Sequence, residues 1–254
     1  MIACAAINSL EPSMTAMTTL LAFDTATEQM NLGVAVAGRV FVHEAAGGAS
    51  ASATLIPAIL ALLAQAGVRL SDLDAIAFGR GPGAFTGLRT ACSVAQGLAY
   101  GAGKPVLAID TLLAVAEDSR AAAAEWRVWS LMDARMNEIY AAQYAFANGV
   151  WETLDAPMLT RADALNQRWL ASPPQAVAGN ALLAFGDQLR PGNALCRSAA
   201  RPSAAAMLTL ARSMWDLGAA VDVALALPLY VRDKVAQTTA ERDAARLAKQ
   251  EARP

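Results

Sequence analysis

The segment Asp74–Asp110, DAIAFGRGPGAFTGLRTACSVAQGLAYGAGKPVLAID, indicates the class of fold. Its first residues form a short apolar run that predicts a buried strand. The glycine-rich stretch Arg80–Arg89 then turns the chain into a helix that extends to about Ala102. The run Val106–Asp110 predicts a second buried strand. A strand–helix–strand unit is typical of parallel strands covered by helices, so the sequence predicts an α/β fold.

The residues before this segment predict three more strands and another helix. The apolar runs Thr19–Asp24, Leu32–Ala37 and Val40–Glu44 are separated by short turns, which is typical of a meander of strands. The run Ala51–Ala66 has helical length and ends at Gly67. A meander followed by alternating helices and strands predicts a mixed sheet with helices on it, the ribonuclease-H-like arrangement.

The pattern restarts in the second half of the chain. After a helix expected over Thr111–Ala124, the run Val128–Asp133 predicts a strand that ends in a carboxylate, as Thr19–Asp24 does. The next elements are expected in the order strand, strand, helix, strand and helix, over Ile139–Phe146, Val150–Leu154, Thr160–Ala171, Ala176–Gly179 and Ser203–Leu217. The restart predicts two duplicated lobes at 18–124 and 125–236, with a disordered leader at 1–17 and a charged tail at 237–254.

Charge and composition exclude several classes of protein. Twenty basic and 22 acidic residues give a formal net charge of −2, so the chain lacks the excess of Lys and Arg that neutralises phosphates in nucleic-acid-binding proteins. Contact with an RNA would therefore come through a partner. Three cysteines are too few for a disulfide framework. No apolar run reaches the roughly 18 to 20 residues of a membrane-spanning helix, and we expect a cytoplasmic protein without a membrane partner.

The glycine-rich turn permits two interpretations. Gly81, Gly83 and Gly87 would let a phosphate approach the backbone ahead of a helix N-terminus, with Thr86 capping that helix. The same glycines would equally serve a tight turn from strand to helix, for which geometry is the only requirement. The sequence leaves both interpretations open.

The end of the first strand offers a second pair of candidate residues. Asp24 and Thr25 stand where an ATPase of the actin type presents a carboxylate and a hydroxyl to the metal and phosphates, although a turn cap explains them equally well. Asp133, with Arg135 two residues later, is the corresponding candidate in the second lobe. The sole histidine, His43, cannot form a metal-binding histidine pair, and we expect it on an exposed strand.

Two helices of the first lobe carry surfaces suited to an interface. The large residues of Ala51–Ala66 cover most of its circumference, and the helix after the glycine turn has a face of small residues. Together they predict half of a four-helix partner interface, formed by Leu55, Ile56, Ile59, Leu63, Ala91, Val94, Ala95 and Leu98. The alternative is that both faces are buried inside the subunit.

Four motifs, in order along the chain, resemble those of a known family. They are LLAFDTAT at Leu20–Thr27, GRGPGAFTGLR at Gly79–Arg89, MDARMNEIYAA at Met132–Ala142 and PLYVRDKVA at Pro228–Ala236. The chain is similar over this whole span to the TsaB (YeaZ) family, the dimerisation subunits of the bacterial tRNA threonylcarbamoyladenosine machinery.

This resemblance implies an actin/hexokinase-like (ASKHA) fold of two lobes. It also implies pairing with a TsaD-like catalytic paralogue and with a TsaE-like ATPase. The assembled complex transfers a threonylcarbamoyl group to N6 of the tRNA adenosine next to the anticodon, so tRNA is reached only through the complex. In the family the helices of the first lobe form the partner interface, and a homodimer through the same helices is a further possibility.

One departure from the catalytic paralogue suggests a role without catalysis. That paralogue holds a metal through a His-x-x-x-His motif, and the corresponding stretch here, residues 50–57, contains no histidine. We therefore predict no catalytic residue and no metal site. Asp24 and Gly81–Gly83 would be relics of a nucleotide site, or would retain weak binding of ATP or ADP with Mg²⁺ there or at the complex interface. The alternative is an autonomous small-molecule kinase or ATPase of the same fold class, using Asp24, Thr25 and Gly81–Gly87.

Overall fold

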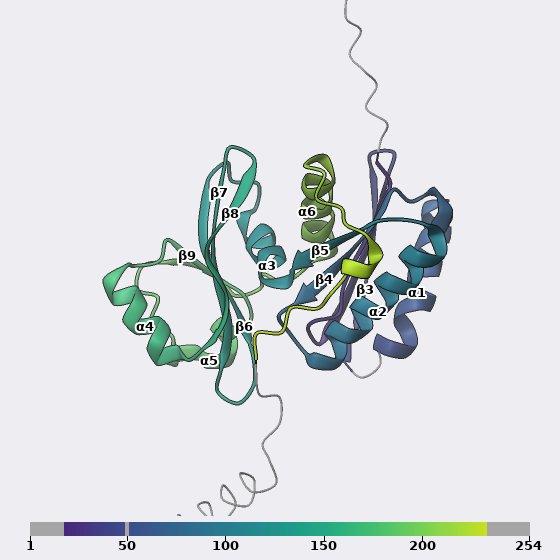
Figure 1. Cartoon of the computed structure of the whole chain (residues 1–254). Helices are drawn as coiled ribbons and strands as arrows, with labels where there is room; N and C mark the ends of the chain where they lie inside the picture. Colours follow the sequence, from purple (N-terminus) through teal and green to yellow (C-terminus); the bar gives the residue numbers. More distant parts are fainter. Residues whose placement is uncertain (1–17, 49–50, 233–254) are drawn as a thin grey trace, which may run out of the picture.

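The computed structural model describes residues 18–48 and 51–232, which form two lobes, each built on a five-stranded mixed sheet (Figure 1). The first sheet has the order β3-β2-β1-β4-β5, with β1 Leu20–Asp24, β2 Gln29–Val36, β3 Arg39–Ala46, β4 Ala75–Gly81 and β5 Val106–Asp110. The second has the order β10-β9-β6-β7-β8, with β6 Trp126–Asp133, β7 Ile139–Ala147, β8 Val150–Thr160, β9 Ala176–Ala178 and β10 Leu195–Arg197.

The two sheets share one topology. In each, three strands form an antiparallel meander, and two later strands add in parallel beside the first strand of that meander. The predicted α/β class and the predicted duplication are both confirmed. The parallel pair of the second sheet is short, at three residues a strand, and the strand β10 carries no alternation that could have revealed it in the sequence.

Helices and sheets alternate in five layers (Figure 1). The helices are α1 Ala51–Ala66, α2 Phe85–Ala102, α3 Thr111–Arg120, α4 Ala162–Ala171, α5 Ala181–Phe185 and α6 Ala204–Asp216, with short 3₁₀ helices η2 Leu70–Asp72, η3 Gly186–Gln188 and η4 Val223–Leu225. The helices α1 and α2 cover the outer face of the first sheet, and α4 and α5 cover the outer face of the second. The helices α3 and α6 fill the space between the sheets.

Each of the two helices between the sheets packs largely on the sheet of the other half of the chain. Leu112 and Val115 of α3 pack on the second sheet, whereas Met207 and Leu208 of α6 pack on the first. Helix α6 packs closely on the first sheet, since a Cβ added at Gly33 of β2 would lie only 2.7 Å from Leu208 Cδ1. The predicted boundary between residues 124 and 125 thus assigns each of these helices to one lobe, while much of its apolar face packs on the sheet of the other. Which sheet a helix covers is not encoded in its own periodicity.

A closing segment, residues 221–232, also returns to the first lobe. Val221 exchanges two backbone hydrogen bonds of 2.9 Å with Val106, and Leu229 N donates to Arg80 O at 2.7 Å. At its far end Arg232 donates to Ala134 O of the second lobe at 2.8 Å. The segment thus ties the lobes together. The predicted leader at 1–17 and tail at 237–254 lie outside the described residues.

The predicted helix surface on α1 and α2 is largely the lobe's own core. Leu55, Ile59, Leu63, Ala91 and Ala95 are buried against the first sheet, so the prediction that they face a partner is wrong for these five residues. Their spacing forms one stripe of each helix, and that stripe covers the sheet. Ile56 is 43% exposed and Leu60 is 52% exposed, while Val94 and Leu98 are half-buried. Within residues 18–48 and 51–232, no helix is both long and apolar enough to cross a membrane.

Candidate functional site

Asp24 is sealed inside the first lobe. Its Oδ1 accepts the backbone N–H of Ala26 at 2.7 Å, and its Oδ2 accepts the hydroxyl of Thr111 at 2.7 Å. The side chain is fully buried, and a Cβ at the neighbouring Gly79 would lie only 1.8 Å from Oδ2. Burial raises the pKa of Asp24 from its ordinary 3.8 to about 6, and the two hydrogen bonds offset part of that rise. In this conformation the carboxylate is inaccessible to a ligand.

The glycine turn packs directly on the residues that follow Asp24. Thr25 Oγ1 donates to Gly87 O at 2.8 Å, and Ala84 N donates to Ala26 O at 2.8 Å. A Cβ at Gly87 would lie 1.9 Å from Thr25 O, and a Cβ at Gly83 would lie 2.6 Å from Ala26 O. Close approach of two backbones is therefore sufficient reason for these glycines.

Two other predictions for this turn need correction. The N-cap of α2 is Ala84, with no side-chain cap, so Thr86 does not cap the helix but lies within its first turn. Gly81 is buried with φ +110°, a backbone conformation that favours glycine, and faces Leu88 and Leu229 O. Neither residue lines the space between the lobes.

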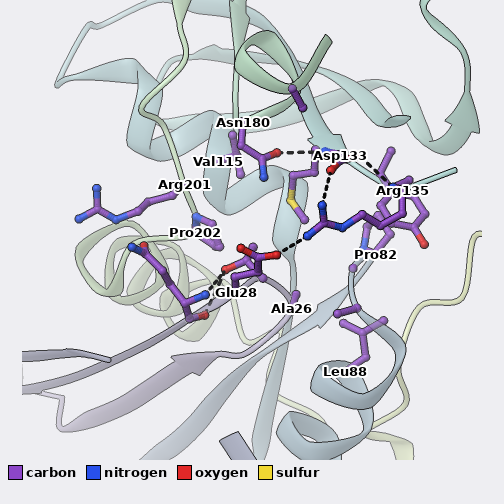
Figure 2. A pocket seen from close by; sticks show the side chains of 18 of the residues that line it. Ala26, Glu28, Pro82, Leu88, Val115, Asp133, Arg135, Asn180, Arg201 and Pro202 are labelled. Atoms are coloured by element: carbon purple, nitrogen blue, oxygen red, sulfur yellow. Dashed lines mark hydrogen bonds and ion pairs between the residues drawn. The ribbon is translucent and has the colours of Figure 1, made fainter. Parts of the chain in front are cut away.

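A cavity of about 790 Å³ lies between the lobes (Figure 2). Glu28, Pro82 and Gly83 line it from the first lobe, and Asp133 and Asn180 line it from the second. Of the predicted nucleotide residues Asp24, Thr25, Gly81, Gly83, Thr86 and Gly87, only Gly83 is part of its wall. The predicted candidates of the first lobe therefore lie mostly behind the cavity wall, whereas Asp133 and Arg135, the predicted candidates of the second lobe, line the cavity.

The hairpin between β6 and β7 reaches across the cavity. Arg135 lies 3.2 Å from the Asp133 carboxylate and also pairs with Glu28 of the first lobe, as Figure 2 shows. The Asp133 N–H donates to Asn180 Oδ1 at 3.0 Å. Asn180 and Glu28 were missed by sequence reasoning, since neither belongs to a pattern that marks a site. The charges here are paired across the two lobes.

Metal-binding side chains do not cluster in the part of the chain that the structure describes. Residues 18–48 and 51–232 contain no group of three or more His, Cys, Asp or Glu side chains that could hold a metal ion. His43 lies exposed on β3, as predicted.

The outer face of α1 and α2 differs from an ordinary helical surface. The two helices comprise 16 and 18 residues and contain one charged residue, Arg89. Ile56, Leu60, Phe85 and Tyr100 are exposed on them. A groove of about 440 Å³ runs beside the start of α2. The residues that line it are Ser52, Phe85, Thr86, Arg89, Thr90, Ser93 and Val94.

Comparison with known proteins gives the family. The protein TsaB of Escherichia coli, named for tRNA threonylcarbamoyladenosine biosynthesis, is 33% identical over 226 residues, which span 85% of this chain and 96% of that protein. The chain belongs to the TsaB/YeaZ family. The TsaB protein of Haemophilus influenzae is 41% identical over 126 residues, which span 49% of this chain and 53% of that protein. The solved structure of YeaZ from Pseudomonas aeruginosa matches with a TM-score of 0.76 at 34% identity, covering 84% of this chain and all of that chain.

The TsaB match extends over both lobes. The family model for TsaD, the tRNA N6-adenosine threonylcarbamoyltransferase, matches residues 42–244 of this chain. The family model that matches this chain is thus that of a catalytic family. The relative that matches over nearly its whole length, by contrast, is a TsaB protein. The predicted actin/hexokinase-like fold of two lobes agrees with both matches.

Proposed function

We propose that the chain is a non-catalytic subunit in tRNA threonylcarbamoyladenosine biosynthesis that binds and activates a TsaD-like paralogue. The paralogue would transfer the threonylcarbamoyl group to N6 of the tRNA adenosine next to the anticodon. The observation that carries this proposal is the nearly uncharged outer face of α1 and α2.

That face has the properties of a partner surface. Helices exposed to water normally carry charged residues on their outer side, whereas α1 has none and exposes Ile56 and Leu60. Exposed apolar patches and a low density of charge are typical of the centres of protein–protein interfaces. Because the TsaD family model matches this chain, a TsaD-like paralogue would present equivalent helices, and the two could pair about an approximate two-fold axis.

The remaining partners follow from charge and from the family. A formal charge of −2 gives this chain little attraction for phosphates, so we propose that tRNA is bound through the paralogue. A TsaE-like ATPase is a further proposed partner, and such a complex would work in the cytoplasm. A homodimer through the same helices is the proposed form in the absence of the paralogue.

The second candidate function is an autonomous small-molecule kinase or ATPase. The cavity of about 790 Å³ between the lobes favours it, because such a cavity has the size of a ligand site. The burial of Asp24 and the packing of Gly87 against Thr25 O weigh against it. Weak binding of ATP or ADP with Mg²⁺, in this cavity or at the complex interface, is compatible with either function. Calorimetry on the isolated chain tests it, and turnover of ATP by that chain would favour the kinase.

The interface is tested with Ile56→Glu plus Leu60→Glu. Both side chains are exposed, so the variant should fold, whereas glutamates at Leu55 and Ile59 would be buried in the core and would unfold the lobe. We expect at least a roughly 100-fold loss of affinity for the TsaD-like paralogue by calorimetry, with loss of stimulated threonylcarbamoyl transfer.

The matched control is Leu170→Glu plus Leu183→Glu. These leucines are exposed on α4 and α5 of the second lobe, away from the proposed face. The control should bind the paralogue as the unmodified chain does. Binding of the Ile56 and Leu60 double variant within threefold of the unmodified chain would overturn the proposed interface.

A further inference from the structure

The single charge on the outer face of α1 and α2 is held in a fixed place. The Arg89 guanidinium carbon lies 3.7 Å from the centroid of the Phe85 ring, and Arg89 Nε donates to Tyr230 Oη at 3.1 Å. The rings of Phe85 and Tyr230 lie 5.8 Å apart. Stacking and one hydrogen bond therefore order a side chain that would otherwise sample many rotamers.

This guanidinium has no carboxylate partner among the residues that the structure describes. Within residues 18–48 and 51–232, Arg89 takes part in no ion pair, and the bond to the Tyr230 hydroxyl is the one hydrogen bond of its side chain. It lines the groove at the start of α2, next to Thr86, Thr90 and Ser93. An ordered arginine with free N–H groups is suited to a bidentate contact with a carboxylate.

We propose that Arg89 makes this face select a partner that presents a carboxylate, in preference to a second copy of this chain. The inference rests on the proposed function and names the chemistry that the TsaD-like partner must supply. Neither α1 nor α2 contains an Asp or a Glu. Self-pairing through these helices therefore brings together two arginines and offers no acidic residue from either helix to accept them.

The physical basis is the free energy of removing a charge from water. A guanidinium buried without a partner opposes association, whereas the same group paired with a carboxylate at close range favours it. Arg89 would thus weaken the pairing of two copies of this chain and strengthen the pairing with the TsaD-like partner. The specificity of the face is the difference between these two binding free energies. The uncharged remainder of the face would supply most of the buried apolar area in either case.

The test measures both pairings for Arg89→Met. Methionine keeps an unbranched side chain that can pack on Phe85, and it removes the charge. Calorimetry gives the affinity for the TsaD-like paralogue, and sedimentation equilibrium gives the self-association constant. We expect the affinity for the paralogue to fall at least roughly 30-fold and to lose much of its salt dependence, while self-association is unchanged or tighter. Tyr230→Phe, which removes the hydrogen-bond acceptor of Arg89 Nε, should lower the affinity for the paralogue by a smaller factor.

The outcomes separate this inference from the proposed function. If Arg89→Met binds the paralogue as the unmodified chain does while Ile56→Glu plus Leu60→Glu does not bind, the role of Arg89 is overturned and the interface stands. If neither variant loses affinity, both proposals fail. An equal loss in both pairings would show that Arg89 contributes packing rather than selection, and it would also overturn the inference.

Discussion

Asp24 and Asp133 occupy the same place in the two lobes but have opposite environments. Each is the last residue of the first strand of its sheet, and each accepts on Oδ1 the N–H of the residue two positions later, at 2.7 Å from Ala26 and 2.8 Å from Arg135. Asp24 is nevertheless fully buried, whereas the Asp133 side chain is 18% exposed and lines the cavity. The two sheets therefore share one topology, but their equivalent aspartates differ in exposure.

The length of one neighbouring strand explains the difference. In the first lobe β4 pairs with β1 up to Phe78 and continues to Gly81, so Gly79 lies against the Asp24 carboxylate. In the second lobe β9 ends at Ala178, which pairs with Ser130, three residues before Asp133. Beyond the strand, Asn180 accepts the backbone N–H of Asp133 at 3.0 Å, and the Asp133 side chain is left lining the cavity. A site in this fold therefore depends on where the fourth strand stops, and the strand order alone does not define it.

Adding a methyl group beside Asp24 is expected to have the largest effect. In Gly79→Ala the new Cβ would lie 1.8 Å from Asp24 Oδ2 and 2.6 Å from Cγ, so the buried carboxylate and its bond to Thr111 must shift. We expect the free energy of unfolding to fall by about 3 kcal/mol or more, measured by urea denaturation. Gly97→Ala is the control, because a methyl group added there, in the middle of α2, would meet no other part of the chain within 4 Å. The control should stabilise the chain by up to about 1 kcal/mol, and a tolerated Gly79→Ala would contradict the account of the sealed carboxylate.

Removing the charge of Asp24 is expected to change how stability depends on pH. Asp24 holds its proton up to about pH 6 in the folded chain but only to about 3.8 in the unfolded chain, so folding is favoured at low pH. The free energy of unfolding should therefore fall by roughly 2 to 2.5 kcal/mol as the pH rises from 4 to 8, with most of the fall below pH 6. Asp24→Asn, which keeps the shape and the acceptor for Ala26 N–H, should lose this fall.

The corresponding substitution in the second lobe is the control for that measurement. Asp133→Asn leaves Asp24 intact and should retain the fall seen in the unmodified chain. Urea denaturation at several pH values between 4 and 8 compares the three proteins. If Asp24→Asn and the unmodified chain follow the same pH curve, the buried carboxylate does not carry the proton that the structure assigns to it.

Much of this fold could be predicted from the sequence, because the apolar periodicity of an element and the turn residues at its ends are local features. The helix Ala51–Ala66 and the strand Val106–Asp110 have the predicted bounds. Ser203, the first residue of a predicted helix, caps α6 by accepting the N–H of Ala206. These elements need only an apolar pattern and a turn residue, and both can be read within a few positions.

The burial of side chains and the contents of the cavity could not be predicted in the same way. Leu55 and Ile56 are adjacent and both apolar, yet Leu55 is buried in the core of the first lobe and Ile56 is exposed. The pairing of Glu28 with Arg135 joins residues from different lobes that lie 107 positions apart in the sequence. Such contacts are set by tertiary packing, which a single sequence does not display.

The two turns that follow Asp24 and Asp133 provide the smallest and sharpest test of the comparison. Arg135, Met136 and Asn137 all have positive φ, between 56° and 62°, whereas Thr27 in the first turn does not. A residue with a Cβ in the left-handed region costs about 1 kcal/mol relative to glycine. We expect Met136→Gly to be more stable than Met136→Ala by about 1 kcal/mol, because both lose the contact of Met136 Sδ with Arg232 and only glycine relieves the strain.

The same pair of substitutions in the first turn should give the opposite sign. Thr27→Gly and Thr27→Ala both lose the hydrogen bonds of the hydroxyl to Gln29, so their difference again reports only the backbone. With φ negative at this position, glycine adds freedom to the unfolded chain and should be less stable than alanine by about 0.5 to 1 kcal/mol. Equal signs in the two turns would mean that the left-handed hairpin is not strained. Opposite signs would show that the duplicated lobes use different backbone conformations at equivalent positions, and that only the second lobe bears the free-energy cost of the conformation that brings Arg135 across the cavity.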